Sequence, residues 1–356
     1  MKRILGLALV SAVLAGGAFA QSISLTNTFG GDTDNIGSKG EFISINKDGT
    51  KETTSSIGDR LQLDVSSEKV DARVRLDLAA PTFKFNDSDS GKIDGKNTTV
   101  RLRGYVDYKP WTWLHLNAGN YFFSKYGLKG AYLPVVDDYR QSGKLTGNSG
   151  ASVIVDVAGL KVAANVAAVA RLNLNFGASY NIADFLDLSV VAQDVTEKTR
   201  IIAGYVGFTG VENLLANVGY IFNDSTGNYL SSTQHAVTAS VGYNFKDIGF
   251  AVYAEGSFGL NNVQGGGTET KYAKDGVPVH AGLLVQYIPV KDVTLNVRAL
   301  LNTKPVDKGT TWSIYPFADF GTTVGTIRVG ARVKFTEDGY NGVEIPISWK
   351  YKFKIK

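Results

Sequence analysis

The sequence predicts an antiparallel, membrane-spanning β-barrel of 16–18 strands, and three observations point to this fold class. Apolar and polar residues alternate in segments along the whole length of the chain. Short turns and long polar stretches alternate as the connections between these segments, and aromatic residues gather near the segment ends. A two-residue period is that of a β-strand, and a barrel wall in a membrane needs one apolar face toward lipid and one polar face toward a wet interior.

The C-terminal segment shows this alternation most clearly, because the last fourteen residues follow it without exception. One face contains the apolar residues Val343, Ile345, Ile347, Trp349, Tyr351, Phe353 and Ile355. The other face contains Glu344, Pro346, Ser348, Lys350, Lys352, Lys354 and Lys356. A strand of this length extends about 45 Å at roughly 3.3 Å per residue, whereas strands of soluble proteins usually have about 5–6 residues. The segment alone also fits an edge strand of a soluble sandwich, so the rest of the chain has to decide.

Eighteen segments show the alternation, and sixteen strands are the alternative because no turn residue separates two of the segments near Ala167–Arg171. The segments are residues 22–28, 59–66, 69–79, 98–109, 113–122, 151–157, 160–168, 171–181, 185–193, 199–209, 213–223, 233–245, 248–259, 277–288, 291–302, 311–320, 325–335 and 343–355. Helical periodicity is almost absent, and after residue 20 no uncharged apolar run reaches 18 residues, so transmembrane helices of roughly 20 residues are not expected. The pattern therefore predicts an all-β chain.

The connections between the segments fall into two length classes. Short ones include Ser67-Glu68, Ala158-Gly159 and Lys246-Asp247. The long, polar and glycine-rich ones are residues 29–58, 80–97, 123–150, 224–232 and 260–276. Barrels in membranes have short turns on one side and longer loops on the other, whereas the Greek-key connections of a sandwich would not sort by length in this way.

Residues 1–20 form a predicted secretory signal peptide, which leaves residues 21–356 as one barrel domain. Lys2 and Arg3 give the charged start, residues 4–14 the apolar core, and Ala18 and Ala20 an A-x-A cleavage site. There is no cysteine, which excludes a disulfide framework, lipidation at a cysteine and cysteine-ligated metals. The formal net charge is only +4, and +2 without Lys2 and Arg3, so we expect no nucleic-acid partner.

The polar faces of the first and last segments are rich in basic residues. The predicted pore-lining residues with this parity are Arg73, Arg75, Arg101, Arg103, Arg328, Arg332 and Lys334. Closure of a barrel pairs the last strand with the first, so these residues would form one basic wall, opposite middle strands that supply Asn, Ser, Thr and Gly. Charged walls select ions in pores. The alternative is that the arginines only pair with neighbouring aspartates and stiffen the wall.

No catalytic constellation stands out, and we predict neither an enzyme nor a bound cofactor. His115, His235 and His280 are scattered, and the chain has no H-E-x-x-H, G-x-S-x-G or P-loop motif. The Asp-rich stretches 32–37 and 87–94 do not match the spacing of an EF-hand, so no metal site is expected. A barrel lipase or protease is the enzymatic alternative, and it lacks a nucleophile–base pair here.

The alternation, the sorted connections and the aromatic ending at Trp349, Tyr351 and Phe353 resemble the bacterial outer-membrane porins over residues 21–356. The chain departs from these porins because it ends on Lys356 and because Pro346, which cannot donate a ladder hydrogen bond, lies inside the last strand. These departures leave the lineage open, with a diverged group such as the spirochaete barrels as one alternative.

The resemblance implies a pore in the outer membrane through which small hydrophilic solutes or ions diffuse passively, with the lipid bilayer and these solutes as partners. It also implies that the third long connection, residues 123–150, folds inward as a constriction, and the apolar character of this segment favours the same placement. Asp137, Asp138 and Tyr139 would then face the basic wall, and weak anion selectivity would follow. A surface adhesin or structural barrel is the alternative function, and a homo-oligomer is left open.

Overall fold

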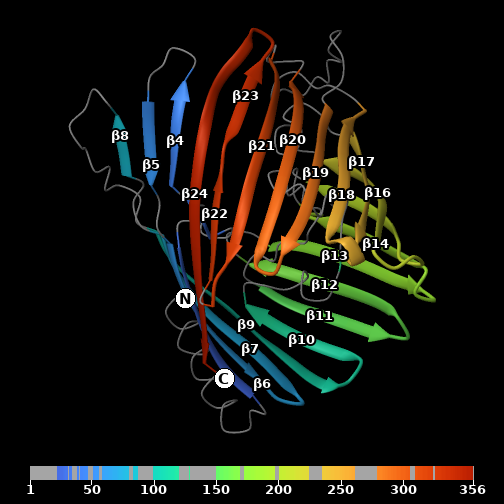
Figure 1. Cartoon of the computed structure of the whole chain (residues 1–356). Helices are drawn as coiled ribbons and strands as arrows, with labels where there is room; N and C mark the ends of the chain where they lie inside the picture. Colours follow the sequence, from blue (N-terminus) through green and yellow to red (C-terminus); the bar gives the residue numbers. More distant parts are fainter. Residues whose placement is uncertain are drawn as a thin grey trace. The chain divides into compact units, whose positions relative to one another are not determined.

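The computed structural model describes residues 22–30, 32–33, 38–39, 41–46, 51–55, 58–79, 83–86, 99–119, 128, 150–168, 172–196, 200–223, 235–260, 279–304, 309–323 and 325–355. Within these residues the secondary structure is β-strand, with one short 3-10 helix, η3 (Lys246–Ile248). Twenty-two strands belong to one antiparallel sheet, and β2 (Asp32–Thr33) pairs with β3 (Ser38–Lys39) separately (Figure 1). No helix in this part of the chain is long and apolar enough to cross a membrane.

The described residues divide into two compact units. The first unit takes in residues from 1–108, 287–297 and 313–356, and the second takes in residues from 109–286 and 298–312. The first unit contains β1 (Ser22–Gly30), β4 (Glu41–Asn46), β5 (Lys51–Ser55), β6 (Gly58–Ser66), β7 (Val70–Ala79), β8 (Phe83–Asn86), β22 (Gly325–Gly330), β23 (Arg332–Thr336) and β24 (Gly339–Ile355). The second unit contains β10 (Leu114–Gly119), β11 (Gly150–Val157), β12 (Leu160–Ala168), β13 (Leu172–Ile182), β14 (Leu186–Gln193), β15 (Ile201–Phe208), β16 (Leu214–Asn223), β17 (His235–Phe245) and β18 (Phe250–Gly259). The residues of β9 (Thr99–Trp111), β19 (Val279–Val290), β20 (Val293–Lys304) and β21 (Gly309–Gly321) are shared between the two ranges.

Each of the eighteen predicted segments corresponds to a strand. The segments on either side of Ala167–Arg171 are two separate strands, β12 and β13, so the count of eighteen is confirmed. The predicted segment 325–335 is interrupted after Gly330, which makes β22 and β23 two pieces of one predicted strand. Ala331 lies at this interruption and donates its backbone N–H to the carbonyl oxygen of Pro316 at 3.0 Å. The register of β24 places Pro346, which has no N–H to donate, across from the interruption.

The prediction that residues 29–58 and 80–97 are loops was wrong in part. These stretches contain β4, β5 and β8, which extend the sheet beside β24 (Figure 1). Ile43 of β4 pairs with Ile345, and Thr53 of β5 pairs with both Ile43 and Phe85. The edge that β4 pairs with is Gly342–Ile347 of β24.

The first and last strands of the predicted barrel pair with each other. β1 is antiparallel to β24, with Leu25 opposite Ile355 and Gly30 opposite Lys350. On its other edge β1 pairs with β6, with Leu25 opposite Leu63. From Leu25 to Gly30 the strand therefore has a partner on both edges within the sheet, as a strand in lipid requires. The predicted pairing of the two ends is therefore confirmed.

The short connections have the geometry of hairpin turns. Ala158 and Gly159 both have positive φ, as the two-residue turn between β11 and β12 requires. In the turn after β15, Glu212 accepts a hydrogen bond of 2.9 Å from Nζ of Lys246 in η3. This hydrogen bond and the charge of Lys246 lower the pKa of Glu212. The contact links two neighbouring turns at the same end of the second unit.

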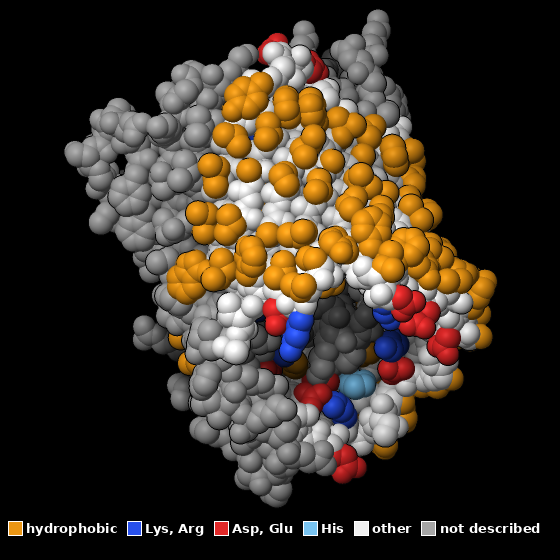
Figure 2. All heavy atoms as spheres, viewed as in Figure 1, with side chains coloured by type: hydrophobic (Ala, Val, Ile, Leu, Met, Phe, Trp, Pro, Cys, Tyr) orange, Lys and Arg blue, Asp and Glu red, His pale blue; other side chains and the backbone are white. Residues whose placement is uncertain are grey.

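The two faces of the sheet differ in chemistry, and the apolar face is the exposed one. We call this the outer face; Leu102 and Val241 are 57% and 56% exposed on it. The opposite, inner face is polar and buried, with Thr238 at 0% and Asn165 at 1% exposure. Figure 2 shows the exposed hydrophobic side chains gathered over the face of the sheet seen in that view. This inverts the burial of a soluble sheet and is the arrangement that a wall between lipid and water needs.

Candidate functional site

The inner face of the first unit contains the predicted basic residues. Strand register places Arg73 of β7 between Asp64 of β6 and Tyr105 of β9. Nε of Arg73 donates to Oδ1 of Asp64 at 2.5 Å, and the guanidinium carbon lies 5.8 Å from the centre of the Tyr105 ring. Nε2 of Gln62 donates to the other oxygen of Asp64 at 2.6 Å. Arg73 is thus fixed by a counter-ion, as the wall-stiffening alternative predicts.

The next inner row of β7 and β9 contains two directly opposed arginines. Arg75 of β7 lies directly opposite Gln62 of β6 and Arg103 of β9. In the backbone register, Gln62 is opposite Thr26 and Thr26 is opposite Lys354. Directly opposed residues have Cβ atoms only about 4.5–5.5 Å apart, so the side chains of Arg75 and Arg103 leave the backbone side by side. Arg75 is only 6% exposed, which reduces screening by solvent.

A second basic cluster lies on the inner face of β21 to β24. Arg328 donates two parallel hydrogen bonds to Asp319, from Nε at 2.7 Å and from Nη2 at 3.1 Å. Nη1 of Arg332 lies 3.7 Å from Oε2 of Glu344, and Nζ of Lys334 donates to the other oxygen of the same carboxylate. Two acids therefore offset three cations in this cluster. The side chains involved are only partly buried, so their charge reaches the inner space.

Two inner aromatic rings support these arginines. Tyr315 and Phe317 of β21 stack with ring centroids 4.6 Å apart, and both rings are buried. The guanidinium carbon of Arg328 lies 4.5 Å from the centre of the Phe317 ring, and that of Arg332 lies 4.9 Å from the centre of the Tyr315 ring. Gly330 lies between the two arginines in sequence, and only a residue without Cβ fits beside these rings. The stack fixes the direction of both guanidinium groups.

The inner face of the second unit is mostly neutral and hydrogen-bonded. Nδ2 of Asn175 donates to Oδ1 of Asn165 at 2.9 Å, and Nδ2 of Asn165 donates to Oγ of Ser152 at 2.9 Å. The backbone N–H of Asp194 donates to Oδ1 of Asn175 at 2.9 Å. Buried Asn, Ser and Thr side chains continue across the neighbouring strands, with Glu255 as a buried acid among them. The neutral character predicted for the middle strands is therefore present on this face.

An apolar row crosses the same inner face. Its members are directly opposed across successive strands: Ile154, Ala163, Gly177, Val191, Ala203, Ile221 and Ala236. Ile154 and Ala203 have no exposed surface, so other parts of the chain cover them. Leu128, the described residue of the predicted constriction segment 123–150, is itself buried at 1% exposure. The inward folding of that segment stays a prediction.

Several predicted site residues lie outside the described part of the structure. Asp137, Asp138 and Tyr139 of the constriction segment are among them, and so are residues 1–20. Arg101 is in β9 opposite Asp77, and its side chain is not among those that the structure describes. Their roles stay predictions.

Sequence reasoning missed three inner residues, Tyr315, Phe317 and Asp319. All three share the parity of the inner face in the predicted segment 311–320, so the alternation could have found them. Tyr315 and Phe317 were missed because aromatic residues were assigned to the membrane interfaces rather than to the interior, and Asp319 was missed because only basic residues were selected as pore-lining.

The histidines do not form a site together. His280 is buried on the inner face, whereas His235 lies at the end of β17, where its Nδ1 is 2.5 Å from the hydroxyl oxygen of Tyr220. Among the described residues, no three His, Asp or Glu side chains are grouped so that they could hold a metal ion.

Comparison with known proteins identifies the fold. No family model matches the chain, and no curated protein matches its sequence. Among solved structures, the outer membrane protein OpdK from Pseudomonas aeruginosa is similar over 95% of this chain and 100% of its own, with a TM-score of 0.61 and 12% identity. Pseudomonas aeruginosa OccK7 (OpdD) matches with a TM-score of 0.61 and 14% identity, covering 94% of this chain and 99% of that one. Acinetobacter baumannii OccAB4 matches with a TM-score of 0.60 and 6% identity over 94% and 99%. The chain therefore has the fold of outer-membrane β-barrels, as the sequence predicted.

Proposed function

We propose that this protein is a porin of the bacterial outer membrane that lets small hydrophilic solutes or ions diffuse passively. The observation that carries the proposal is the inverted burial of the sheet, with exposed apolar residues such as Val241 on one face and polar residues such as Asn165 on the other. A barrel of about this strand number is wide enough to enclose an aqueous channel. The likeness to outer-membrane β-barrels supports the same placement in the membrane.

The pore is weakly anion-selective in this proposal, because cations outnumber acids in the basic cluster of β21 to β24, where Arg328, Arg332 and Lys334 face Asp319 and Glu344. Arg73 and Arg328 each pair with an aspartate and contribute little net field. Arg75 and Arg103 are directly opposed on adjacent strands and add to the positive charge of the wall. Two unit charges 4 Å apart interact by about 1 kcal/mol in water and about 4 kcal/mol at intermediate dielectric, so an excess charge on the wall acts on ions that pass close to it. The preference should fade at high salt as screening shortens the reach of the field.

The arrangement of arginines over aromatic rings suggests a class of solute. Arg328 and Arg332 lie against Phe317 and Tyr315 and already contact the carboxylates of Asp319 and Glu344, so this wall has the groups that recognise a carboxylate. One of the similar structures is Pseudomonas aeruginosa OpdK with vanillate. We therefore include small organic carboxylates among the solutes that this pore would pass.

Replacing Arg75 and Arg103 with serine is expected to shift the reversal potential toward cations. The double variant removes the opposed charges while leaving the neighbouring ion pairs in place. The measurement is the zero-current potential of purified protein in planar bilayers under a tenfold KCl gradient. The matched control is the pair Asp64→Ser and Arg73→Ser, which removes one acid and one base together and should leave the potential nearly unchanged.

An unchanged potential in the Arg75 and Arg103 variant would mean that the basic wall has a structural role only. Complete absence of conductance from an intact, inserted barrel would contradict the porin and favour the adhesin or structural alternative.

A further inference from the structure

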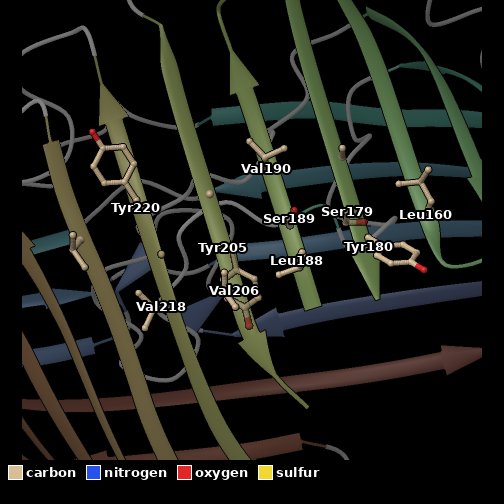
Figure 3. A pocket seen from close by; sticks show the side chains of 14 residues that line it. Leu160, Ser179, Tyr180, Leu188, Ser189, Val190, Tyr205, Val206, Val218 and Tyr220 are labelled. Atoms are coloured by element: carbon tan, nitrogen blue, oxygen red, sulfur yellow. The ribbon is translucent and has the colours of Figure 1, made fainter. Parts of the chain in front are cut away.

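The outer face of the second unit contains a hollow that is surrounded by apolar side chains projecting from the sheet. Its volume is about 520 Å³, and its lining includes outward residues of six successive strands, β12 to β17. Figure 3 shows Leu188, Val190, Val206 and Val218 around it. Pockets of this size, about 300–1,000 Å³, hold small ligands in other proteins. A hollow this large on the lipid-facing side of a barrel needs an occupant.

Gly204 of β15 creates the hollow. It lies directly opposite Val190 on one side and Tyr220 on the other, and both partners have full side chains. A Cβ built at Gly204 would have no atom within 4 Å, so the space above it is open. Tyr180 and Tyr220 are both exposed and stand on either side of the open space (Figure 3). Because Gly204 has no side chain while its neighbours Val190 and Tyr220 project from the sheet, the surface at this position is a groove.

A second hollow of about 580 Å³ shares the residues Val206 and Val218 with the first. It extends the apolar surface toward Phe208 and Val241, on the side of the short turns. The two hollows together run along the strands for several residues. Each hollow also spans six strands, β12 to β17 and β14 to β19, so the apolar surface is broad enough to hold a hydrocarbon chain.

One end of the groove has a polar group. The hydroxyl of Tyr220 lies 2.5 Å from Nδ1 of His235, and the His235 ring is 5.1 Å from the ring of Phe222. His235 begins β17 and Phe222 is opposite it, so the pair sits where the strands give way to a long connection. Aromatic residues with polar tips are typical of the level at which lipid headgroups lie. The groove thus has a polar end at a membrane interface and an apolar length below it.

We propose that this groove is a binding site for a membrane lipid, with an acyl chain beside Gly204 and the headgroup at the Tyr220–His235 pair. Water is a poor occupant because it needs two to four polar partners, and the outward side chains around Gly204 are apolar. A chain of methylene groups would restore the dispersion contacts that the missing side chain leaves unmade. The proposal shares with the proposed function only the requirement that the barrel lies in a membrane.

A photoreactive lipid tests the site. The full-length protein is reconstituted in phosphatidylethanolamine–phosphatidylglycerol vesicles that contain a trace of phosphatidylethanolamine with a diazirine in its acyl chain. After irradiation, mass spectrometry compares adducts on peptides around Val190, Val206 and Val218 with adducts on peptides around the equally outward Val153 and Leu295. We expect about threefold enrichment at the groove, the ratio that a small free-energy preference gives.

Gly204→Phe should remove the enrichment because the new side chain fills the hollow. Ala178→Phe should also remove it, because Ala178 lines the same hollow from β13. Ala164→Phe is the matched control, since Ala164 is exposed on β12 and does not line the hollow. Tyr220→Phe with His235→Phe should reduce labelling while the hollow stays open. Even labelling of the outer face would overturn the proposed site. An equal loss of enrichment in the Ala164 variant would also overturn it, as would crosslinked pairs of protein chains in place of lipid adducts.

Conductance separates this test from that of the pore. Gly204→Phe lies on the outer face and should leave single-channel conductance unchanged. An inserted barrel with enriched labelling but no conductance would refute the porin and leave the lipid site standing. A conducting barrel whose outer face is labelled evenly would refute the lipid site and leave the porin standing.

Discussion

Deleting Trp349–Lys356 is expected to abolish insertion of the barrel into membranes. The deletion removes the partner of β1 in all six registered pairs between β1 and β24, from Leu25–Ile355 to Gly30–Lys350. It also removes three of the pairs that β24 makes with β22. In lipid, each backbone N–H and C=O without a partner costs several kcal/mol, so two open strand edges would outweigh the other contacts. The measurement is the fraction of protein that refolds into vesicles and migrates as a compact, heat-modifiable band in a gel.

A shorter deletion provides the control. Removing only Ile355 and Lys356 eliminates one of the six pairs with β1 and leaves the rest of the strand in register. We expect this variant to insert like the full chain. Failure of the short deletion together with success of the long one would show that the unusual lysine end, rather than strand pairing, directs assembly.

Replacing Gly330 with alanine is expected to destabilise the barrel by about 1–3 kcal/mol, the usual range for overpacking. A Cβ at this position would lie 2.6 Å from Cβ of Phe317, 2.7 Å from the carbonyl oxygen of Pro316 and 2.7 Å from a ring carbon of Tyr315. Two of these atoms belong to the backbone or lie next to it, so they cannot move aside independently. Urea unfolding in detergent, followed by tryptophan fluorescence, measures the loss.

Gly204→Ala is the matched control for this substitution, because its new Cβ would meet nothing within 4 Å. It should leave the barrel unchanged or slightly more stable, since alanine restricts the unfolded chain more than glycine does. The Gly330 variant should also weaken the stacking of Arg328 and Arg332 on the two rings. Equal stability of the two variants would show that the strand interruption after Gly330 absorbs the extra methyl group.

The alternation of residues was sufficient to predict the strands and their two faces. Leu102 and Val241 are exposed and Asn175 is buried, because a strand in a membrane wall shows its pattern in every second residue. The pairing of β1 with β24 followed from closure of an even-numbered antiparallel sheet. The two faces of a strand follow from its own sequence, and the pairing of the first and last strands follows from barrel closure. Neither prediction requires knowledge of which residues lie opposite each other on neighbouring strands.

The features that could not be predicted depend on which residues become neighbours across strands. The interruption after Gly330 lies between Pro316 of β21 and Pro346 of β24. The sequence does not show that these two prolines lie opposite Gly330 and Ala331, because the register of the strands is unknown beforehand. β4 was missed because Phe42 and Ile43 are adjacent apolar residues, which breaks the alternation within a short segment, and β5 was missed because its five residues are all polar. The row that joins Arg75 to Arg103 was also invisible until the register was known.

The central claim is that one face of this sheet meets lipid and the other meets water, and adjacent residues of one strand test it most directly. Leu102 is exposed on the outer face of β9, and Arg103 follows it on the inner face. The chain has no cysteine, so a single cysteine at either position can carry a spin label without further changes. In vesicles, a label at Leu102 should be accessible to oxygen and shielded from a polar nickel reagent, and a label at Arg103 should show the reverse. Equal accessibility at the two positions would contradict the barrel wall and the pore that depends on it.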